Sequence, residues 1–362
     1  MQIVPLTYTT LYAELAQRAL DASFTSEFST DGRFVTQESR GRRYWYFDTA
    51  SGADKKRRYV GPVDDPEISK RVEGFKSLKA EVRARRKLVS TLVREAYLPR
   101  PEQKSGDVVR ALAEAGFFRL RGVLVGPVAY QCYPALLGIR LPDTAMQTAD
   151  ADFAQFHALS MEVGDEVEPL LEKLREIDPT FRHVPHRHDG RFSTQIISKD
   201  GYRIDFLTPN TGSDDYQGRP ARMPSLAGMS AEPPRFLDFL IHQPERAVVL
   251  HGEGIPVIVP APERFAVHKL IVATERRIDG NGLAKSGKDR AQALSLFQAM
   301  TETRRVDALA DAFMEAWDRG PKWQAAIATS MRMLDPRALM AVTAPLSASI
   351  RHLEGDPAKY GL

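Results

Sequence analysis

Residues 121–153 read RGVLVGPVAYQCYPALLGIRLPDTAMQTADADF, and this stretch decides how the central part of the chain is interpreted. It opens with an apolar run that ends at Gly126 and leads into a helical pattern, and it closes with Asp150 and Asp152 two positions apart. Alternate residues of a strand point to the same face, so the two carboxylates converge while Ala151 points the other way. The stretch therefore predicts a strand that presents a pair of acids.

A third carboxylate follows further along the chain. Asp205 lies in the apolar run YRIDFL, residues 202–207, where burial of a carboxylate without a metal or another partner would be costly. If its strand neighbours that of Asp150 and Asp152, three acids meet. Such a set suits one or two Mg²⁺ (or Mn²⁺) ions, which prefer oxygen ligands and often keep phosphate oxygens as partners. The alternative is a solvated pair of surface acids, which is the common state of an isolated D-x-D.

This succession of a strand ending in glycine, a helix, a D-x-D strand and a further Asp strand resembles the core of the polymerase-beta-type nucleotidyltransferase superfamily. The resemblance is greatest to bacterial nucleotidyltransferase-fold proteins related to the abortive-infection and toxin nucleotidyltransferases, and it covers roughly residues 107–300. We therefore expect an α+β fold: a small mixed-sheet core with helices, flanked by a basic N-terminal helix and hairpin region and a C-terminal helical region.

The resemblance implies that Asp150 and Asp152 bind metal and nucleotide phosphates, and that Asp205 completes the catalytic metal site and activates the attacking hydroxyl. It also places Gly126 and Pro127 beside the nucleotide, where the superfamily has Gly-Ser or Gly-Gly. Proline removes a backbone donor and the hydroxyl, so this departure weakens the phosphate grip expected at a helix start. Proline is nevertheless well tolerated at a first helical position.

Cations that could hold the departing pyrophosphate lie downstream. Lys269 is on a helix predicted to begin at Pro262, and it resembles the downstream lysine of the superfamily. Arg276 lies about two turns further on, and Lys285 and Lys288 follow a Gly-rich link. Fixed cations at this point would stabilise the leaving group. We take Lys269 and Arg276 as the nucleotide-binding candidates, and a solvated surface charge is the alternative for each.

The chain divides at two predicted boundaries. We expect a basic N-terminal domain with a β-hairpin and a long helix over residues 1–102, a nucleotidyltransferase catalytic core over 103–262, and a C-terminal helical domain over 263–362. The net charge of +3 hides an asymmetry, because residues 40–100 carry 17 Lys and Arg against 8 Asp and Glu, a local net charge of +9. This excess favours a polyanionic partner.

The predicted N-terminal hairpin combines aromatic rings with cations. Rings that stack bases and cations that follow phosphates are typical of RNA binding. The nucleic-acid-binding candidates are Arg42, Arg43, Tyr44, Tyr46, Lys56, Arg57 and Arg58. The alternative is an ordinary hairpin whose alternate rings are core.

Several classes of protein are disfavoured. The chain has no G-x-x-x-x-G-K-[ST] phosphate loop and no G-x-S-x-G nucleophile elbow. The histidines of HVPHRH, residues 183–188, have no cysteine nearby, which makes a zinc site less favoured than a basic loop. No apolar run of about 18 residues occurs, so no membrane partner is expected. The single Cys132 fits a reducing compartment, and we expect a cytoplasmic protein.

Three functions remain open at this point. The first is a Mg²⁺-dependent nucleotidyltransferase that transfers NMP from an NTP to a nucleic-acid acceptor, with a tRNA end as one option. The second keeps the chemistry and changes the acceptor to a protein or small-molecule hydroxyl. The third is a catalytically degenerate module that binds RNA or another partner, for which Pro127 would mark the lost activity. The NTP base, the acceptor and the oligomeric state are left open.

Overall fold

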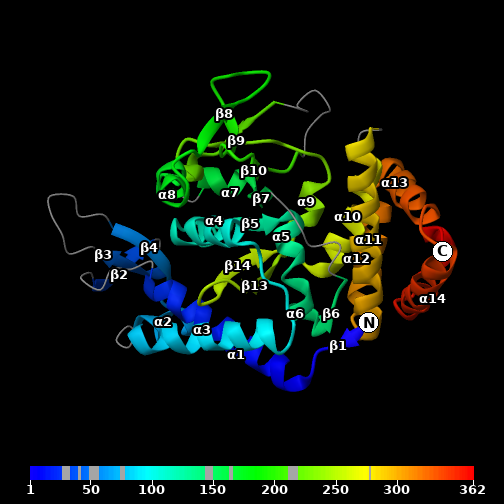
Figure 1. Ribbon diagram of the computed structural model, residues 1–362, viewed down its shortest axis with the longest axis horizontal. Helices are drawn as coiled ribbons and strands as arrows, with labels where there is room; N and C mark the ends of the chain where they lie inside the picture. The colour runs from blue at the N-terminus through cyan, green and yellow to red at the C-terminus, as the bar shows by residue number, and fades with distance from the viewer. Residues whose placement is uncertain are drawn as a thin grey trace.

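The computed structural model in Figure 1 describes residues 1–26, 33–39, 42–48, 57–73, 78–142, 150–162, 166–210, 219–276 and 279–362. Helices surround a mixed sheet, so the protein is α+β as the sequence predicts. Along the described ranges no helix is both long enough and apolar enough to cross a lipid bilayer.

The central sheet has five strands. In spatial order they are β5 (Val123–Val125), β7 (Asp150–Ala154), β10 (Arg203–Leu207), β9 (Ser193–Ile197) and β8 (Arg182–Pro185). β7 and β10 run parallel and every other neighbouring pair is antiparallel, which confirms the predicted mixed sheet, and β9 and β10 form a hairpin. Ala151, Phe153, Ile204 and Phe206 are fully buried on one face, and the period of two then sends the aspartates to the other face.

Helices pack against the sheet and join its strands. α4 (Gln103–Glu114) contacts both β7 and α8 (Leu170–Ile177), and its Val108 and Leu112 belong to the main apolar core. Between β5 and β7 the helical pattern that follows Gly126 is split ahead of Pro134. It forms α5 (Gly126–Tyr130) and α6 (Tyr133–Leu137).

The C-terminal part is wholly helical, as predicted. Its helices are α10 (Pro262–Thr274), α11 (Gly280–Glu302), α12 (Val306–Asp318), α13 (Pro321–Arg332) and α14 (Pro336–His352). Three of them begin with proline in the first turn, where the ring fixes a helical φ and the missing N–H has no partner to lose. α10 packs against α11, α12 and α13, and this stack stands beside the sheet in Figure 1.

The N-terminal part combines helices with a small antiparallel sheet. Its elements are α1 (Leu6–Ser26), β2 (Arg33–Ser39), β3 (Arg42–Asp48), β4 (Arg57–Pro62), α2 (Pro66–Glu73) and α3 (Leu78–Arg94). The predicted hairpin is the β3–β4 pair. The single long helix expected over residues 67–98 is described as α2 and α3, and residues 74–77 between them lie outside the described part of the chain.

This N-terminal part is not isolated from the core. Leu15 of α1 and Leu92 of α3 share a second apolar cluster with Val248 and Leu250. Val248 belongs to β13 (Glu245–Val249), which forms the predicted antiparallel hairpin with β14 (Ile255–Val259). The division into three domains stays a prediction. The remaining short elements are β1 (Gln2–Ile3), β6 (Ile139–Arg140), α7 (His157–Glu162), β11 (Ala221–Arg222), β12 (Ser230–Ala231) and α9 (Leu237–Leu240), with 3-10 turns at Pro224–Leu226 and Pro357–Tyr360.

Candidate active site

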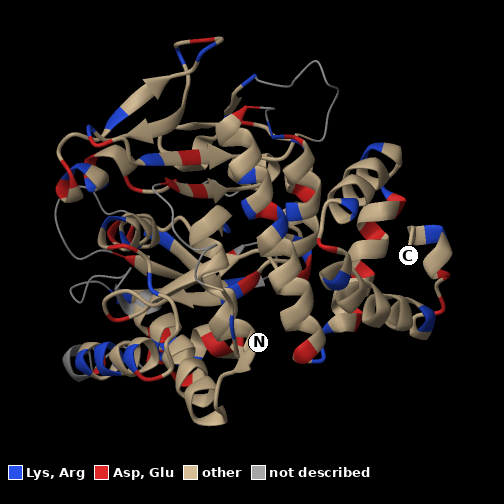
Figure 2. Cartoon of the chain, turned by 45° about the vertical axis from the view of Figure 1, so that its right-hand side comes forward, with Lys and Arg blue, Asp and Glu red and all other residues tan. Residues whose placement is uncertain are grey.

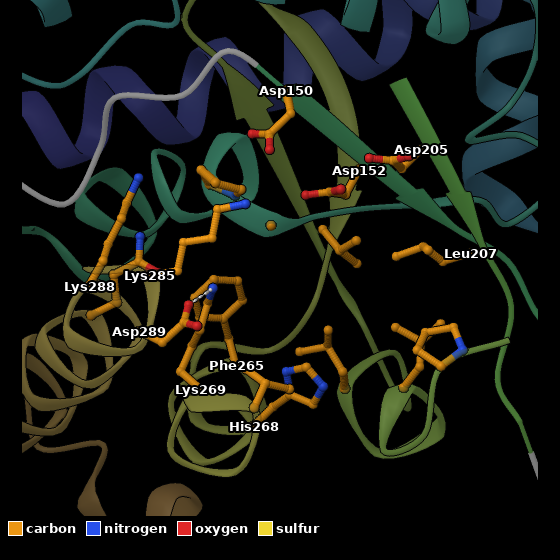
Figure 3. A pocket seen from close by; sticks show the side chains of 18 of the residues that line it. Asp150, Asp152, Asp205, Leu207, Phe265, His268, Lys269, Lys285, Lys288 and Asp289 are labelled. Atoms are coloured by element: carbon orange, nitrogen blue, oxygen red, sulfur yellow. Dashed lines mark hydrogen bonds and ion pairs between the residues drawn. The ribbon is translucent and has the colours of Figure 1, made fainter. Parts of the chain in front are cut away.

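The three predicted aspartates share one face of the sheet. Asp152 on β7 is the register partner of Asp205 on β10, so their Cα atoms are about 4.8 Å apart, the spacing of neighbouring strands. Asp150 lies two residues before Asp152 on the same face, with Arg203 as its register partner. In Figure 3 all three carboxylates border the same cavity. The predicted meeting of the D-x-D pair with the distant Asp is therefore present in the structure.

Gly126 stands directly against the acids. It follows Val125, the register partner of Asp152 on β5, and it has a left-handed φ of +67°. A Cβ at this position would lie 2.1 Å from Oδ2 of Asp152, so only glycine leaves room for the carboxylate. Pro127 comes next, in the first turn of α5, and it offers no N–H to a ligand.

Burial and mutual repulsion change the titration of the acids. Burial, together with the nearby charges of Asp150 and Asp205, raises the pKa of Asp152 to about 7. Burial also raises the pKa of Asp205, although the Gln195 side-chain amide donates a hydrogen bond to its Oδ1 and opposes that rise. Asp152 and Asp205 are thus desolvated carboxylates close to one another. Keeping them ionised costs free energy unless a cation binds, so a purely structural role would not favour them.

An ion cluster faces the acids from the helical side, with Lys269 and Asp289 buried and Arg276 exposed. Lys269 of α10 donates to Oδ1 of Asp289 at 2.6 Å, and Arg276 donates to Oδ2 at 2.8 Å. Burial alone would raise the pKa of Asp289, but the charges of Lys269 and Arg276 outweigh it and hold that pKa below its usual range. The two predicted nucleotide-binding cations therefore line the cavity already bound to an acid that the sequence interpretation did not include.

Two further lysines of α11 line the same cavity. Lys285 is exposed and makes no hydrogen bond or ion pair with any residue in the described ranges. In Figure 3 it extends toward the carboxylates, and its charge acts on Asp205. Burial and repulsion from Lys269 lower the pKa of Lys288. The two lysines supply positive charge opposite the acidic strands.

The acids and the cations enclose one cavity of about 570 Å³. That volume is in the range of small-molecule sites. Its remaining wall is largely apolar and comes from β10, from the segment around α9, and from α10, where Phe265 and His268 line it. Strands β7 and β10 of the central sheet and helices from the C-terminal part therefore build the site together.

The donor set fits a divalent cation of the Mg²⁺ kind. Carboxylate oxygens are its preferred ligands, and the close approach of Gly126 leaves Oδ2 of Asp152 in a cradle that a Cβ would fill. As the side chains stand, no three acids, histidines or cysteines of the described residues are grouped closely enough to hold an ion. Asp150, Asp152 and Asp205 would therefore have to turn toward a bound cation.

The predicted nucleic-acid residues of the hairpin are partly engaged within the protein. Arg57 makes a bidentate pair with Asp48 at 2.7 and 2.9 Å, and Arg58 pairs with Glu168 at 3.1 Å. The rings of Tyr44 and Tyr46 pack on Tyr59, at 5.9 and 5.8 Å between centroids. Arg43 is exposed, whereas the Arg42 side chain and the whole of Lys56 lie outside the described part of the chain. RNA binding by this hairpin stays a prediction.

We expect Gly126→Ala to remove most of the site's activity while the protein stays folded. The new Cβ would displace the Asp152 carboxylate, whereas Gly201→Ala has a similar left-handed φ of +89° and no atom within 4 Å. Both variants carry the same kind of backbone strain, on the order of 1 kcal/mol. Measuring turnover and thermal unfolding of both variants separates the displacement of Asp152 from the backbone strain. Equal activities would show that the contact with Asp152 does not matter.

The fold and the site together define the class: an α+β protein with carboxylates and cations set around one cavity fit for a phosphorylated ligand. Residues 103–318 match the family described as Nucleotidyltransferase, and the chain belongs to this family. The crystal structure of an antigenic nucleotidyltransferase-like protein from Paracoccidioides brasiliensis aligns at a TM-score of 0.30 and 12% identity, over 64% of this chain and 95% of that chain. No curated protein matches the chain. The narrower likeness to polymerase-beta-type toxin relatives stays a prediction.

Proposed function

We propose that the protein transfers NMP from an NTP to an acceptor hydroxyl at the cavity between the acidic strands and α10–α11. The observation that carries the proposal is the register of Asp152 with Asp205, which sets two desolvated carboxylates side by side opposite a group of cations. Family membership supports a transferase that uses an NTP.

Each acid has a distinct role in this proposal. Asp150 and Asp152 would hold Mg²⁺ or Mn²⁺, and Asp205 would complete the set. The bound ion would neutralise the triphosphate and polarise its α-phosphate. Asp205 would take the proton from the attacking hydroxyl, since burial raises its pKa and makes it a better proton acceptor than an ordinary surface aspartate.

The cations of the helical side would receive the triphosphate. Lys285 is exposed and without a partner among the described residues, so it is the side chain most able to contact a phosphate directly. Lys269 and Arg276 are held by Asp289 and act as a fixed positive background. Pro127 has no N–H to offer at the start of α5, and in this proposal the lysines of α11 replace that contact.

We further propose that the acceptor is a nucleic acid, with RNA favoured. α3 carries the exposed side chains of Arg83, Lys87 and Arg94. Figure 2 shows Lys and Arg gathered along this helix. Positive charge of this kind attracts a polyanion at moderate salt. Arg57 and Arg58 form ion pairs within the protein, so the hairpin has less positive charge to offer a nucleic acid. A protein or small-molecule hydroxyl is therefore the second candidate acceptor.

Incubation with each labelled NTP, Mg²⁺ and total RNA tests the proposal. We expect label in RNA, and we expect Asp205→Asn to abolish it while Asp200→Asn, which changes an exposed acid in the β9–β10 turn, leaves it intact. Label on a polypeptide or a soluble compound would support the second acceptor class. If the folded protein labels nothing with any NTP, catalysis is refuted and the degenerate binding module is left.

A further inference from the structure

One side of the cavity has no part in the chemistry proposed above. Leu207 of β10 and Leu237 and Leu240 of α9 form an apolar surface, with Arg235 beside them. In the view of Figure 3, Leu207 lies to the right and His268 below, away from Lys285 and Lys288 on the left. A triphosphate seated on the lysines would leave this apolar part of the cavity to the rest of the nucleotide.

His268 is a partly exposed polar group that lines the cavity beside this apolar surface. It lines the cavity from α10 and makes no hydrogen bond with any residue in the described ranges. Burial, with the charges of Lys269 and Arg276, lowers the pKa of His268 to about 3, so the ring is neutral at physiological pH. A neutral imidazole carries one donor and one acceptor. His268 is partly exposed, and no residue of the described ranges bonds its ring, so both nitrogens can bond a ligand that enters the cavity.

We propose that this apolar part of the cavity binds the nucleoside of the NTP and that His268 determines base preference by hydrogen bonding to the base edge. The inference rests on the proposed function. It gives a binding site to the nucleoside, the part of the NTP that the acids and lysines do not contact. The base packs against Leu207, the most exposed residue of this apolar surface, and base edges present the adjacent donors and acceptors that a neutral imidazole can match. The cavity of about 570 Å³ is large enough for a whole NTP.

The test compares nucleotide and phosphate affinities with the full-length protein in Mg²⁺. Affinities for the four NTPs, as analogues that resist cleavage between the α- and β-phosphates, and for inorganic tripolyphosphate are measured by calorimetry. His268→Phe keeps the ring and removes the polar atoms. We expect this variant to bind the preferred NTP about tenfold more weakly, because one hydrogen bond is lost. The four NTPs should then bind with similar affinities, and the affinity for tripolyphosphate should stay unchanged.

Two further variants make the result specific. His268→Gln retains a donor and an acceptor, and we expect it to change which base is preferred rather than to remove preference. His183→Phe alters a histidine of β8 outside the cavity and should change nothing. Deoxynucleotides separate a base contact from a ribose contact. If the effect of His268→Phe disappears with deoxynucleotides, His268 contacts the ribose and the proposed base reading is wrong.

The remaining outcomes distinguish this inference from the proposed function. An equal loss for NTP and tripolyphosphate, or no loss for either, overturns the role of His268. Wild-type protein that binds tripolyphosphate as tightly as any NTP has no nucleoside site, although the phosphate site of the proposed function stands. Wild-type protein that binds neither ligand refutes the proposed function and this inference together.

Discussion

Asp152→Asn is expected to lower nucleotidyl transfer by at least about 1,000-fold, which corresponds to roughly 4 kcal/mol of transition-state stabilisation. Asparagine keeps the shape of the side chain in the cradle beside Gly126 but removes the charge that would hold a cation. The position has no other evident use for a carboxylate, because its neighbours Asp150 and Asp205 are themselves acids.

The same substitution should make the metal-free protein more stable. Burial and the two neighbouring acids raise the pKa of Asp152 from 3.8 to about 7 in the folded state. Folding therefore favours the protonated form, and this contribution to stability is fully present below pH 3.8 and lost as the pH rises to about 7. Asparagine cannot ionise, so the variant should melt higher than the wild type at pH 8 and not at pH 4.

Thermal unfolding with a chelator at pH 4, 6 and 8 measures this effect. Added Mg²⁺ or Mn²⁺ should raise the melting temperature of the wild type and leave the variant nearly unchanged. Asp178→Asn is the matched control, because a hydrogen bond from Lys104 lowers the pKa of Asp178 to about 2. That control should lose stability at pH 8 and keep full activity. A wild type and an Asp152→Asn protein with equal melting curves at pH 8 would contradict the buried repulsion.

Asp289→Asn should have the largest effect on stability. Asp289 is 3% exposed and is the common acceptor of Lys269 and Arg276. Loss of one partner of a buried pair leaves an uncompensated charge and costs about 3–5 kcal/mol. The pKa of Asp289 is held low, so its contribution is present above the ordinary carboxyl range and is lost as the pH falls through the folded pKa. The difference between the two proteins should therefore shrink in acid.

Chemical denaturation at pH 7 and at pH 3 measures that difference. The double variant Lys269→Met and Asp289→Leu removes both buried charges, and we expect it to recover most of the lost stability. Its activity then separates two roles. A stable but inactive double variant means that the buried cation serves the reaction, and an active one means that the pair is structural. A single variant as stable as the wild type would refute the cluster as a buried ion pair.

The sequence contained enough to predict the acidic half of the site. Strand periodicity puts Asp150 and Asp152 on one face, and the apolar residues around Asp205 indicate another core strand. The family resemblance suggested that the two strands are neighbours, and neither their parallel direction nor their register was predicted. Pairing between strands fifty residues apart depends on the packing of the whole core, which local pattern does not contain.

The cationic half was predicted only in part. Lys269 and Arg276 were recognised, but their common acceptor Asp289 was not, because ion pairs between helices leave no fixed spacing in sequence. One signal was available: Asp289 shares the inward face of α11 with Ala293 and Leu296, so an acid there needs a partner. Gln195 was also missed, although the β9–β10 hairpin makes it the direct register partner of Asp205.

The two walls of the cavity come from distant parts of the chain. The three proposed metal-binding aspartates all precede Leu207 in the sequence, whereas Lys269, Lys285 and Asp289 all follow Val259. A chain emerging from the ribosome therefore has its acidic strands long before the opposing helices exist. A fragment that ends at residue 262 would keep every proposed metal ligand, with Arg203 and Arg235, and lack Lys269, Arg276 and the lysines of α11. Under the proposed function, catalytic competence should thus arise only after α10 and α11 have been synthesised and have packed beside the sheet.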